Sequence, residues 1–340
     1  MENPVLVEVT RGGRIESRHR GAVAVSDPDG RLVLALGDVD AAVFPRSAVK
    51  ALQALPLIES GAADKYKLSE AEIALACASH SGEPIHVETA RTALAKCGRD
   101  AGALECGVHW PLDPDAARAL AASGAAASAL HNNCSGKHAG FICVACAAGI
   151  DQRGYVKPRH LVQREVTAAL EGATATKLDE TSAGVDGCAI PAYALPLRSL
   201  ARGFARFGTG VGLGPKRAAA SARLRAACAA HPHLVAGTGR FDTLVMTALG
   251  ARAFVKGGAE GVHCAALSDL GFGVAIKCDD GAGRAAEVVM AALIARFLPL
   301  SDREHALLDA RLNPPIRNWN GERVGGLAAA EVFGLLTKAT

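Results

Sequence analysis

The chain has 340 residues, half of them hydrophobic and only 4% aromatic, so its core must be built from Ala, Val and Leu. Its formal net charge is only +3, which gives no reason to expect nucleic acid or an anionic membrane as a partner. The first residues do not read as a signal peptide, and the apolar runs are too short or interrupted to span a bilayer. We therefore expect a cytoplasmic protein whose ten cysteines are thiols, buried side chains or metal ligands rather than disulfides.

The N-terminal segment, residues 5–37, predicts antiparallel strands. Its valines alternate up to a turn at Gly12-Gly13, and residues 27–30 (Asp-Pro-Asp-Gly) predict a second turn. Helical patterning begins at Ser47. Further on, residues 69–72 (Ser-Glu-Ala-Glu) carry the serine and glutamate spacing of a helix start.

The rest of the chain predicts helices in the middle and strands near the end. Residues 66–249 read as mainly helical, and strands are expected at 252–256, 262–267 and 272–278, followed by a helix over 284–297. We therefore expect one domain, 1–340, of the α/β (α+β) class. Its mixed, mainly antiparallel sheet would come from both chain ends, 1–65 and 250–340, with the helical region inserted between them. This arrangement would bring Ser47 close to Lys256.

Two distant segments suggest a Ser/Lys hydrolase that forms an acyl-enzyme. In Ser47-x-x-Lys50 the two residues share one face of a helix, so the lysine can take the serine's proton if burial or a neighbouring cation lowers its pKa. Lys256 follows an apolar strand and precedes two glycines that allow a substrate to lie against the backbone. Alone, a Ser-x-x-Lys is common on protein surfaces, and the second segment is what favours catalysis.

Two polar segments interrupt apolar helical stretches. Ser79-His80-Ser81-Gly82-Glu83 supplies hydroxyls, an imidazole and a carboxylate, and it reads equally well as an ordinary helix-end loop. If Lys256 activated Ser79, the pair would complete a second Ser/Lys arrangement. The segment 131–140 is the densest polar cluster of the chain and includes Asn133 and His138. Arg240 is a candidate for pairing with a carboxylate, either the substrate's or a structural aspartate's.

A metal site is the third possibility. Cys134 and Cys188 lie in separate segments, and two thiolates from such segments can hold a soft divalent metal such as zinc. His138 or an unusual neutral lysine would complete the shell. The sequence contains no paired Cys-x-x-Cys pattern that would support this interpretation independently.

These segments together resemble the rhizobial-type L-asparaginases, also called the asparaginase II or class 3 family. The similarity runs in order from near the start of the chain to position 281 and rests on residues 44–50 (Phe-Pro-Arg-Ser-x-x-Lys), 79–83, 133–138, 185–188, 235–240, 256–261 and 277–281. The resemblance implies a fold similar to serine β-lactamases and glutaminases, hydrolysis of L-asparagine to L-aspartate and ammonia, and a homodimer.

The resemblance also implies roles for individual residues. Ser47 with Lys50 and Ser79 with Lys256 would form two catalytic Ser–Lys pairs. The zinc ligands would be Cys134, Lys137 and Cys188, with water as the fourth. The remaining assignments are to substrate binding, and they fall on Arg46, His80, Asn133, His138, Asp186 and Arg240. Zinc would either bind the α-amino or carboxylate group of the substrate or hold the two segments together.

Two other functions share some of these features. A β-lactamase or penicillin-binding relative also contains Ser-x-x-Lys and Lys-x-Gly, but this chain lacks a Ser-Asp-Asn triplet and shows no secretion signal. A non-catalytic regulatory protein could use the Cys134/Cys188 site to bind zinc. It would show no amidase activity after zinc loading.

Overall fold

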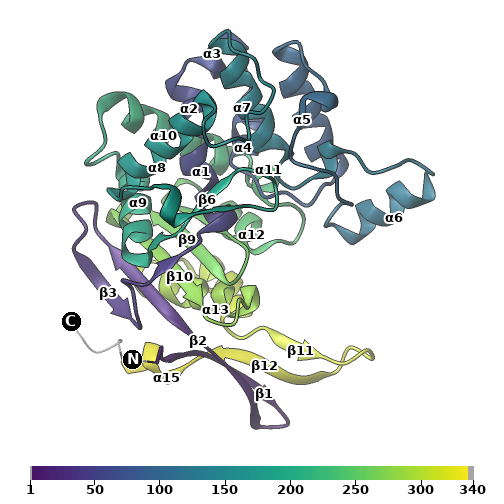
Figure 1. Cartoon of the computed structure of the whole chain (residues 1–340). Coiled ribbons are helices and arrows are strands. Elements are labelled where there is room, and N and C mark those ends of the chain that lie inside the picture. Colours follow the sequence, from purple (N-terminus) through teal and green to yellow (C-terminus); the bar gives the residue numbers. More distant parts are fainter. Residues whose placement is uncertain (1, 336–340) are drawn as a thin grey trace.

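The computed structural model describes residues 2–335, in which a twisted antiparallel sheet lies beside a large group of helices (Figure 1). The sheet has eight strands in the order β11-β12-β1-β2-β10-β9-β8, with β3 beside β2. Its strands are β1 (Val5–Arg11), β2 (Arg14–Ser26), β3 (Leu32–Leu36), β8 (Ala253–Gly257), β9 (Val262–Leu267), β10 (Phe272–Cys278), β11 (Pro315–Arg317) and β12 (Arg323–Ala329). Because β2 from the start of the chain pairs with β10 from near its end, both chain ends build one sheet. The predicted mixed α/β fold is confirmed.

The sheet is buried on both faces at its centre. Val274, Ala275 and Ile276 are consecutive in β10 and all 0% exposed, although successive side chains of a strand point to opposite faces. Two helices pack on this region of β9 and β10, α9 (Leu197–Thr209) and α13 (Gly283–Phe297). The predicted strands and the last predicted helix thus lie within one or two residues of their expected bounds.

Most of the other helices are short and lie on the side of the sheet that carries the middle of the chain (Figure 1), whereas α14 (Asp302–Leu312) packs against α13 and α15 (Glu331–Leu335) lies beside β1. The others are α1 (Lys50–Gln53), α2 (Leu55–Glu59), α3 (Ala62–Lys65), α4 (Glu70–Ala76), α5 (Pro84–Lys96), α6 (Pro114–Ala122), α7 (Ser135–Ala147), α8 (Leu161–Thr174), α10 (Pro215–Ala230), α11 (Pro232–Val235) and α12 (Phe241–Leu249). The 3₁₀ helices are η1 (Arg46–Val49), η2 (Ala101–Ala103), η3 (Ala129–His131), η4 (Glu180–Ser182), η5 (Gly250–Arg252) and η6 (Ser268–Leu270).

Local signals in the sequence have the predicted consequences. The Ser69 hydroxyl accepts a hydrogen bond from the backbone N–H of Glu72, whose carboxylate accepts one from the Ser69 N–H, so a capping box begins α4. The turn at 27–30 closes through a bond from the Gly30 N–H to the Asp27 carbonyl at 3.1 Å. The helix expected at Ser47 begins instead as the 3₁₀ helix η1. In that geometry residues i and i+3 still share a face.

Three short strands occur inside the region expected to be mainly helical. Two of them pair with each other, β5 (Ala183–Val185) with β6 (Pro191–Tyr193), and the third, β7 (Leu195–Pro196), pairs with β4 (Ala42–Val43) from the N-terminal part of the chain. The tight turn between β5 and β6 carries Asp186 and Cys188, and it closes through a bond from the Asp186 N–H to the Ile190 carbonyl at 2.9 Å. These small pairs give the turn a fixed position against the N-terminal segment.

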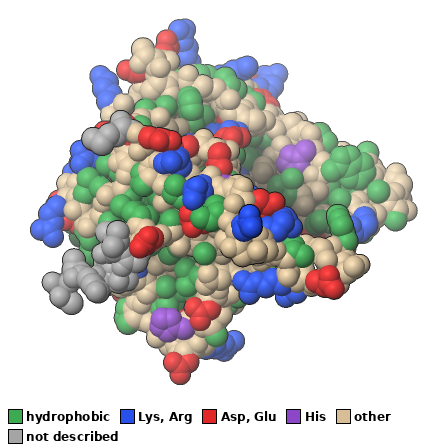
Figure 2. Space-filling view, turned by 90° about the horizontal axis from the view of Figure 1, so that it is seen from below, with side chains coloured by type: hydrophobic (Ala, Val, Ile, Leu, Met, Phe, Trp, Pro, Cys, Tyr) green, Lys and Arg blue, Asp and Glu red, His purple; other side chains and the backbone are tan. Residues whose placement is uncertain are grey.

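The surface carries both charge signs. Acidic and basic side chains are intermingled over the face shown in Figure 2. Large hydrophobic side chains are nevertheless exposed in the segment before α6, where Val108, Trp110 and Leu112 are each at least half exposed. Within residues 2–335, no helix combines the length and the hydrophobicity needed to cross a membrane.

Candidate active site

Ser47 lies in η1, which packs against the hairpin formed by β8 and β9. The contact is so close that only glycine fits at position 258, since a Cβ atom there would lie 2.7 Å from the carbonyl oxygen of Pro45 and 3.1 Å from the Ala48 nitrogen. Arg46, just before the serine, has the positive φ of 51° that side-chain-bearing residues rarely adopt. The chain therefore holds Ser47 against the end of the Lys256 strand, as the sheet topology predicts.

Lys50 is buried behind Ser47, with only 1% of its surface exposed. Its amine donates a hydrogen bond to the backbone carbonyl of Asn133 at 3.2 Å. Burial lowers the pKa of Lys50, and the nearby Lys137 charge acts in the same direction, although Cys134 and Cys188 oppose it. The lysine thus loses its proton more easily than a solvated lysine, as a general base requires.

Lys256 is the second buried amine, also 1% exposed. It donates to the Gly257 carbonyl at 2.8 Å, and its Nζ lies 3.7 Å from the Oδ2 atom of Asp242. Burial lowers the pKa of Lys256 to about 8, against the raising effect of the Asp242 carboxylate. This amine therefore changes its protonation state close to neutral pH.

Ser47 and Ser79 open into the same cavity, which has a volume of about 230 Å³. Ser79 is held there by a bond from its N–H to the Val235 carbonyl at 3.0 Å. Within residues 2–335, no hydrogen bond joins either serine hydroxyl to a lysine amine. The cavity is smaller than those that hold drug-sized ligands, and its polar lining residues are Ser47, Ser79, Asn133, Arg240, Asp242, His263 and Glu287.

Three of the predicted metal ligands converge beside the cavity. Cys134 directly precedes α7, Lys137 lies in the first turn of that helix, and Cys188 comes from the β5–β6 turn. The Lys137 amine lies 3.1 Å from the Cys188 sulfur, and all three side chains are buried. None of the three lines the 230 Å³ cavity.

The electrostatics of this group depend on the contact between the two thiols. Contact with Cys188 holds the pKa of Cys134 well below its usual value, while contact with Cys134, together with burial, raises the pKa of Cys188. Burial alone would lower the pKa of Lys137, but the sulfur charges outweigh it and raise that pKa. Two sulfurs and one amine nitrogen form a donor set that fits zinc, provided that Lys137 gives up its proton.

A comparison with protein families identifies the chain. The model of the family described as L-asparaginase II matches residues 7–329. The chain belongs to the L-asparaginase II family. It is therefore an amidohydrolase, an L-asparaginase acting on a small-molecule amide. No curated protein matches the chain significantly.

Other predicted site residues of this L-asparaginase lie outside the cavity lining. Arg46 binds Asp186 through its Nε atom at 3.0 Å, and this ion pair lines a neighbouring cleft. His80 and His138 are fully buried, and burial lowers the pKa of both rings, so that both are neutral. Their substrate-binding roles stay predictions, whereas Asn133 and Arg240 do line the cavity.

The two buried histidines hold the segments around α7. Gly82 donates its N–H to Nδ1 of His80 at 3.1 Å, so Nε2 carries the proton and donates to the Ser135 hydroxyl at 2.9 Å. The Tyr155 hydroxyl accepts the Glu105 N–H and forms a hydrogen bond with Nδ1 of His138 at 2.6 Å. The bonds of His80 fix its tautomer, and the contacts of both rings orient the start of α7, where Cys134 and Lys137 lie.

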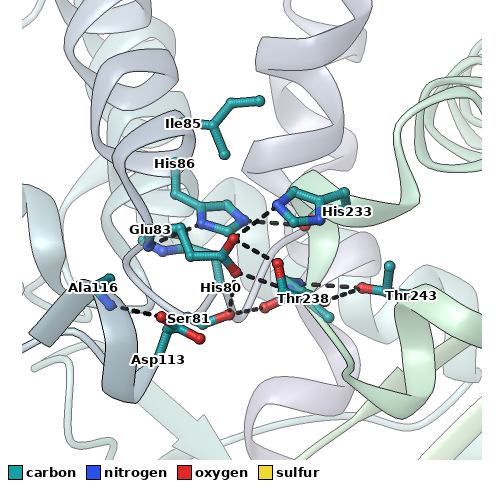
Figure 3. Close-up of polar contacts among 12 residues, drawn as sticks. His80, Ser81, Glu83, Ile85, His86, Asp113, Ala116, His233, Thr238 and Thr243 are labelled. Atoms are coloured by element: carbon teal, nitrogen blue, oxygen red, sulfur yellow. Dashed lines mark hydrogen bonds and ion pairs between the residues drawn. The ribbon is translucent and has the colours of Figure 1, made fainter.

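A second group of possible metal ligands consists of Glu83, His86 and His233, whose side chains face one another (Figure 3). Its donor atoms are already used. His86 accepts the Glu83 N–H at Nδ1, and its Nε2 contacts the His233 carbonyl at 3.0 Å. The Glu83 carboxylate accepts the N–H and the hydroxyl of Thr238, each at 2.8 Å, and contacts His233 Nε2 at 3.1 Å.

This cluster is therefore better described as a hydrogen-bonded clamp than as a metal site. It joins the loop after Ser79 to the loop that carries Arg240. The joint is tight, because a Cβ atom at Gly237 would lie 1.7 Å from the Ser81 hydroxyl, and Gly237 has a φ of +122°. The clamp fixes two elements of the cavity wall relative to each other.

The sequence analysis of this L-asparaginase did not select Asp242, His263 or Glu287. The signals were present but weak. His263 is a single imidazole in the otherwise apolar strand β9, and Glu287 is a single acid among the buried alanines and valines of α13. A polar residue in such a setting indicates a buried partner or a cavity. Nothing in the sequence alone shows which other residues share that cavity.

Proposed function

We propose that this L-asparaginase hydrolyses L-asparagine to L-aspartate and ammonia through an ester of Ser47. The observation that carries the proposal is that Ser47 and Ser79 line one small cavity while two buried lysines with lowered pKa values, Lys50 and Lys256, lie behind its wall. A buried amine whose pKa is lowered can take the proton of a serine hydroxyl and so activate the serine as a nucleophile.

The first step is acylation. Neutral Lys50 takes the proton of the Ser47 hydroxyl, whose oxygen attacks the side-chain amide carbonyl of the substrate. The resulting oxyanion is stabilised by backbone N–H groups, including that of Ser47. Protonated Lys256 then supplies a proton through Ser79 to the departing amine. Ammonia leaves and the aspartyl ester remains on Ser47. Ser79 paired with Lys256 is the alternative nucleophile.

The second step releases the product. Water attacks the ester, its proton passes to the neutral amine left by the first step, and the Ser47 oxygen recovers a proton as L-aspartate leaves. We expect glutamine to be a poorer substrate rather than an excluded one, because one extra methylene in a pocket changes binding by only about 1–3 kcal/mol.

Zinc is part of the proposal, with Cys134, Lys137 and Cys188 as the ligands. When bound there, zinc would act as a Lewis acid that replaces the Lys137 proton and joins the start of α7 to the β5–β6 turn. Because these three residues are not part of the cavity lining, we favour this joining role over direct binding of the substrate.

We also propose a cytoplasmic homodimer. The ten cysteines are all unpaired, which fits a reducing compartment. The exposed Val108, Trp110 and Leu112 give an apolar surface that association would cover. Light scattering of the purified protein measures the dimer directly.

The deciding experiment for the reaction measures ammonia release from L-asparagine and from L-glutamine, with and without a zinc chelator. Brief acid quenching during turnover, followed by peptide mass analysis, locates the aspartyl ester. An ester on Ser47 with asparagine as the better substrate supports the proposal. Absence of ammonia release from asparagine by the zinc-loaded protein refutes it, and nitrocefin hydrolysis instead would indicate a β-lactamase.

A further inference from the structure

The cavity contains more charge than the proposed acylation uses. Besides the serines it is lined by Arg240, Asp242 and Glu287 together with His263. Asp242 is already committed, because its Oδ1 lies 2.9 Å from His263 Nε2 and its Oδ2 accepts the Gly257 N–H at 2.9 Å. This bonding leaves His263 and Asp242 as a mutually satisfied pair in the cavity wall.

Arg240 and Glu287 are different. Neither side chain forms a hydrogen bond or ion pair with another residue in the described part of the chain, 2–335. Arg240 is exposed at the start of α12, while Glu287 is half-buried in α13. The cavity thus holds one cation and one anion that are available to a ligand, supplied by separate helices of the wall.

The environment of Glu287 favours a cationic ligand. Burial raises the pKa of its carboxyl group, and the nearby Asp242 carboxylate raises it further, while His263 and Arg240 act in the opposite direction. A half-buried carboxylate without a partner is costly, and an ammonium group placed beside it would remove that cost. The partner must come from the cavity, since the protein supplies none among the described residues.

We propose that Glu287 binds the α-ammonium group of the substrate while Arg240 binds its α-carboxylate. This inference rests on the proposed function and defines its substrate as a zwitterionic α-amino acid amide rather than a simple amide. The arginine is suited to the carboxylate because its guanidinium can donate two parallel hydrogen bonds. With both α-groups held at this part of the wall, the side-chain amide is the group left free to reach the serines.

Two analogues separate the roles of the two residues. Succinamate is asparagine without its α-amino group, and β-alaninamide is asparagine without its α-carboxylate. Glu287→Gln should raise KM on the order of 10- to 100-fold for asparagine and β-alaninamide but leave succinamate unchanged. Arg240→Gln should raise KM for asparagine and succinamate but leave KM for β-alaninamide unchanged. For an analogue that is turned over too slowly, its inhibition constant against asparagine replaces KM.

The control is Glu165→Gln, which removes a charge from the exposed surface of α8 and should change none of these constants. If Glu287→Gln raised KM equally for succinamate and asparagine, the inference would be overturned. Unchanged KM or inhibition constants for all three amides would overturn it as well. Wild-type turnover of asparagine tests the proposed function by itself. Failure of the proposed function can therefore be distinguished from failure of the binding roles assigned to Glu287 and Arg240.

Discussion

Asp242 and Lys256 are buried together, with the carboxylate Oδ2 atom 3.7 Å from the lysine Nζ atom. The same carboxylate holds the Gly257 backbone and contacts His263. Asp242 thus fixes the end of β8 and keeps Lys256 protonated more readily than burial alone would allow. Asp242, at the edge of the sheet, therefore influences whether Lys256 carries the proton that the proposed reaction needs.

The pH dependence of turnover follows from this pair. Lys256, with its pKa of about 8, is mostly protonated at neutral pH and loses its proton as the pH rises through that value. Since the proposed step needs the ammonium form as proton donor, kcat/KM should fall on the alkaline side with an apparent pKa of about 8. Asp242→Asn removes the charge that raises this pKa, so the fall should move to lower pH.

The measurement is the pH profile of ammonia release at low asparagine concentration. Asp115→Asn, which removes an exposed carboxylate from α6, is the matched control and should leave the profile unchanged. An alkaline limb that stays in place in Asp242→Asn would show that Lys256 is not the group responsible.

Removal of the proposed nucleophile is the second test. Ser47→Ala should lower kcat on the order of 10⁴- to 10⁶-fold, because a nucleophile cannot be replaced by its neighbours. Ser17→Ala, at an exposed position of β2, should have no effect. If Ser79 only relays a proton, Ser79→Ala will still form the ester on Ser47. An ester found in Ser47→Ala would instead assign the attack to Ser79.

The elements near Ser47 and Lys256 could be predicted because their local patterns are strong. The strands β8, β9 and β10 are apolar runs bounded by glycines and turns, and the start of α4 is coded by Ser69 and Glu72. The proximity of Ser47 to Lys256 could also be predicted, since both chain ends supply strands to one sheet. The 3₁₀ form of η1 was not predicted, and neither was the close approach of Gly258 to Pro45, because Gly258 is more than 200 residues away in the sequence.

The cavity wall was less predictable. Asp242, His263 and Glu287 come from a helix, a strand and another helix, and only the fold makes them neighbours. Likewise, Glu83 reads as an ordinary loop acid until its bonds to Thr238 are visible. Sequence patterns specify which residues are unusual for their element. They do not specify which of these residues meet.

Metal removal tests the zinc proposal. Zinc should copurify with the protein and be lost in Cys134→Ser and Cys188→Ser, whereas Cys146→Ser, outside the group, should keep it. A metal that binds only the folded protein stabilises it, by about 2.7 kcal/mol when the metal is present at 100 times its Kd. Loss of the metal removes this stabilisation. The melting temperature should therefore fall. Zinc binding should also weaken as the pH falls, because Lys137 must be neutral to act as a ligand.

The effect of zinc loss on KM separates the two roles considered for the metal. With the three ligands outside the cavity lining, KM for asparagine should stay the same in any folded, zinc-free protein. A folded Cys134→Ser protein whose KM rises sharply would contradict the joining role and favour direct substrate binding by the metal.

The clamp at Glu83 gives the last prediction. Glu83→Ala removes the acceptor for Ser81 and Thr238, and leaving such donors unpaired costs about 1–3 kcal/mol of stability. Because the clamp positions Ser79 and Arg240, kcat/KM should fall as well, while zinc content stays unchanged. Glu165→Ala, at an exposed position of α8, is the control.

The clamp should also depend on pH with a defined sign. Burial alone would raise the pKa of Glu83, but hydrogen bonds from Thr238 and the nearby His233 outweigh it and lower that pKa. The stabilisation is therefore present above the carboxyl group's ordinary pKa and is lost as the pH falls through its lowered value. The stability difference between the wild type and Glu83→Ala, measured by urea unfolding, should narrow in acid. If the stability difference stayed constant as the pH fell through the lowered pKa of Glu83, the hydrogen-bonded clamp would be refuted. A loss of zinc from Glu83→Ala would refute it as well.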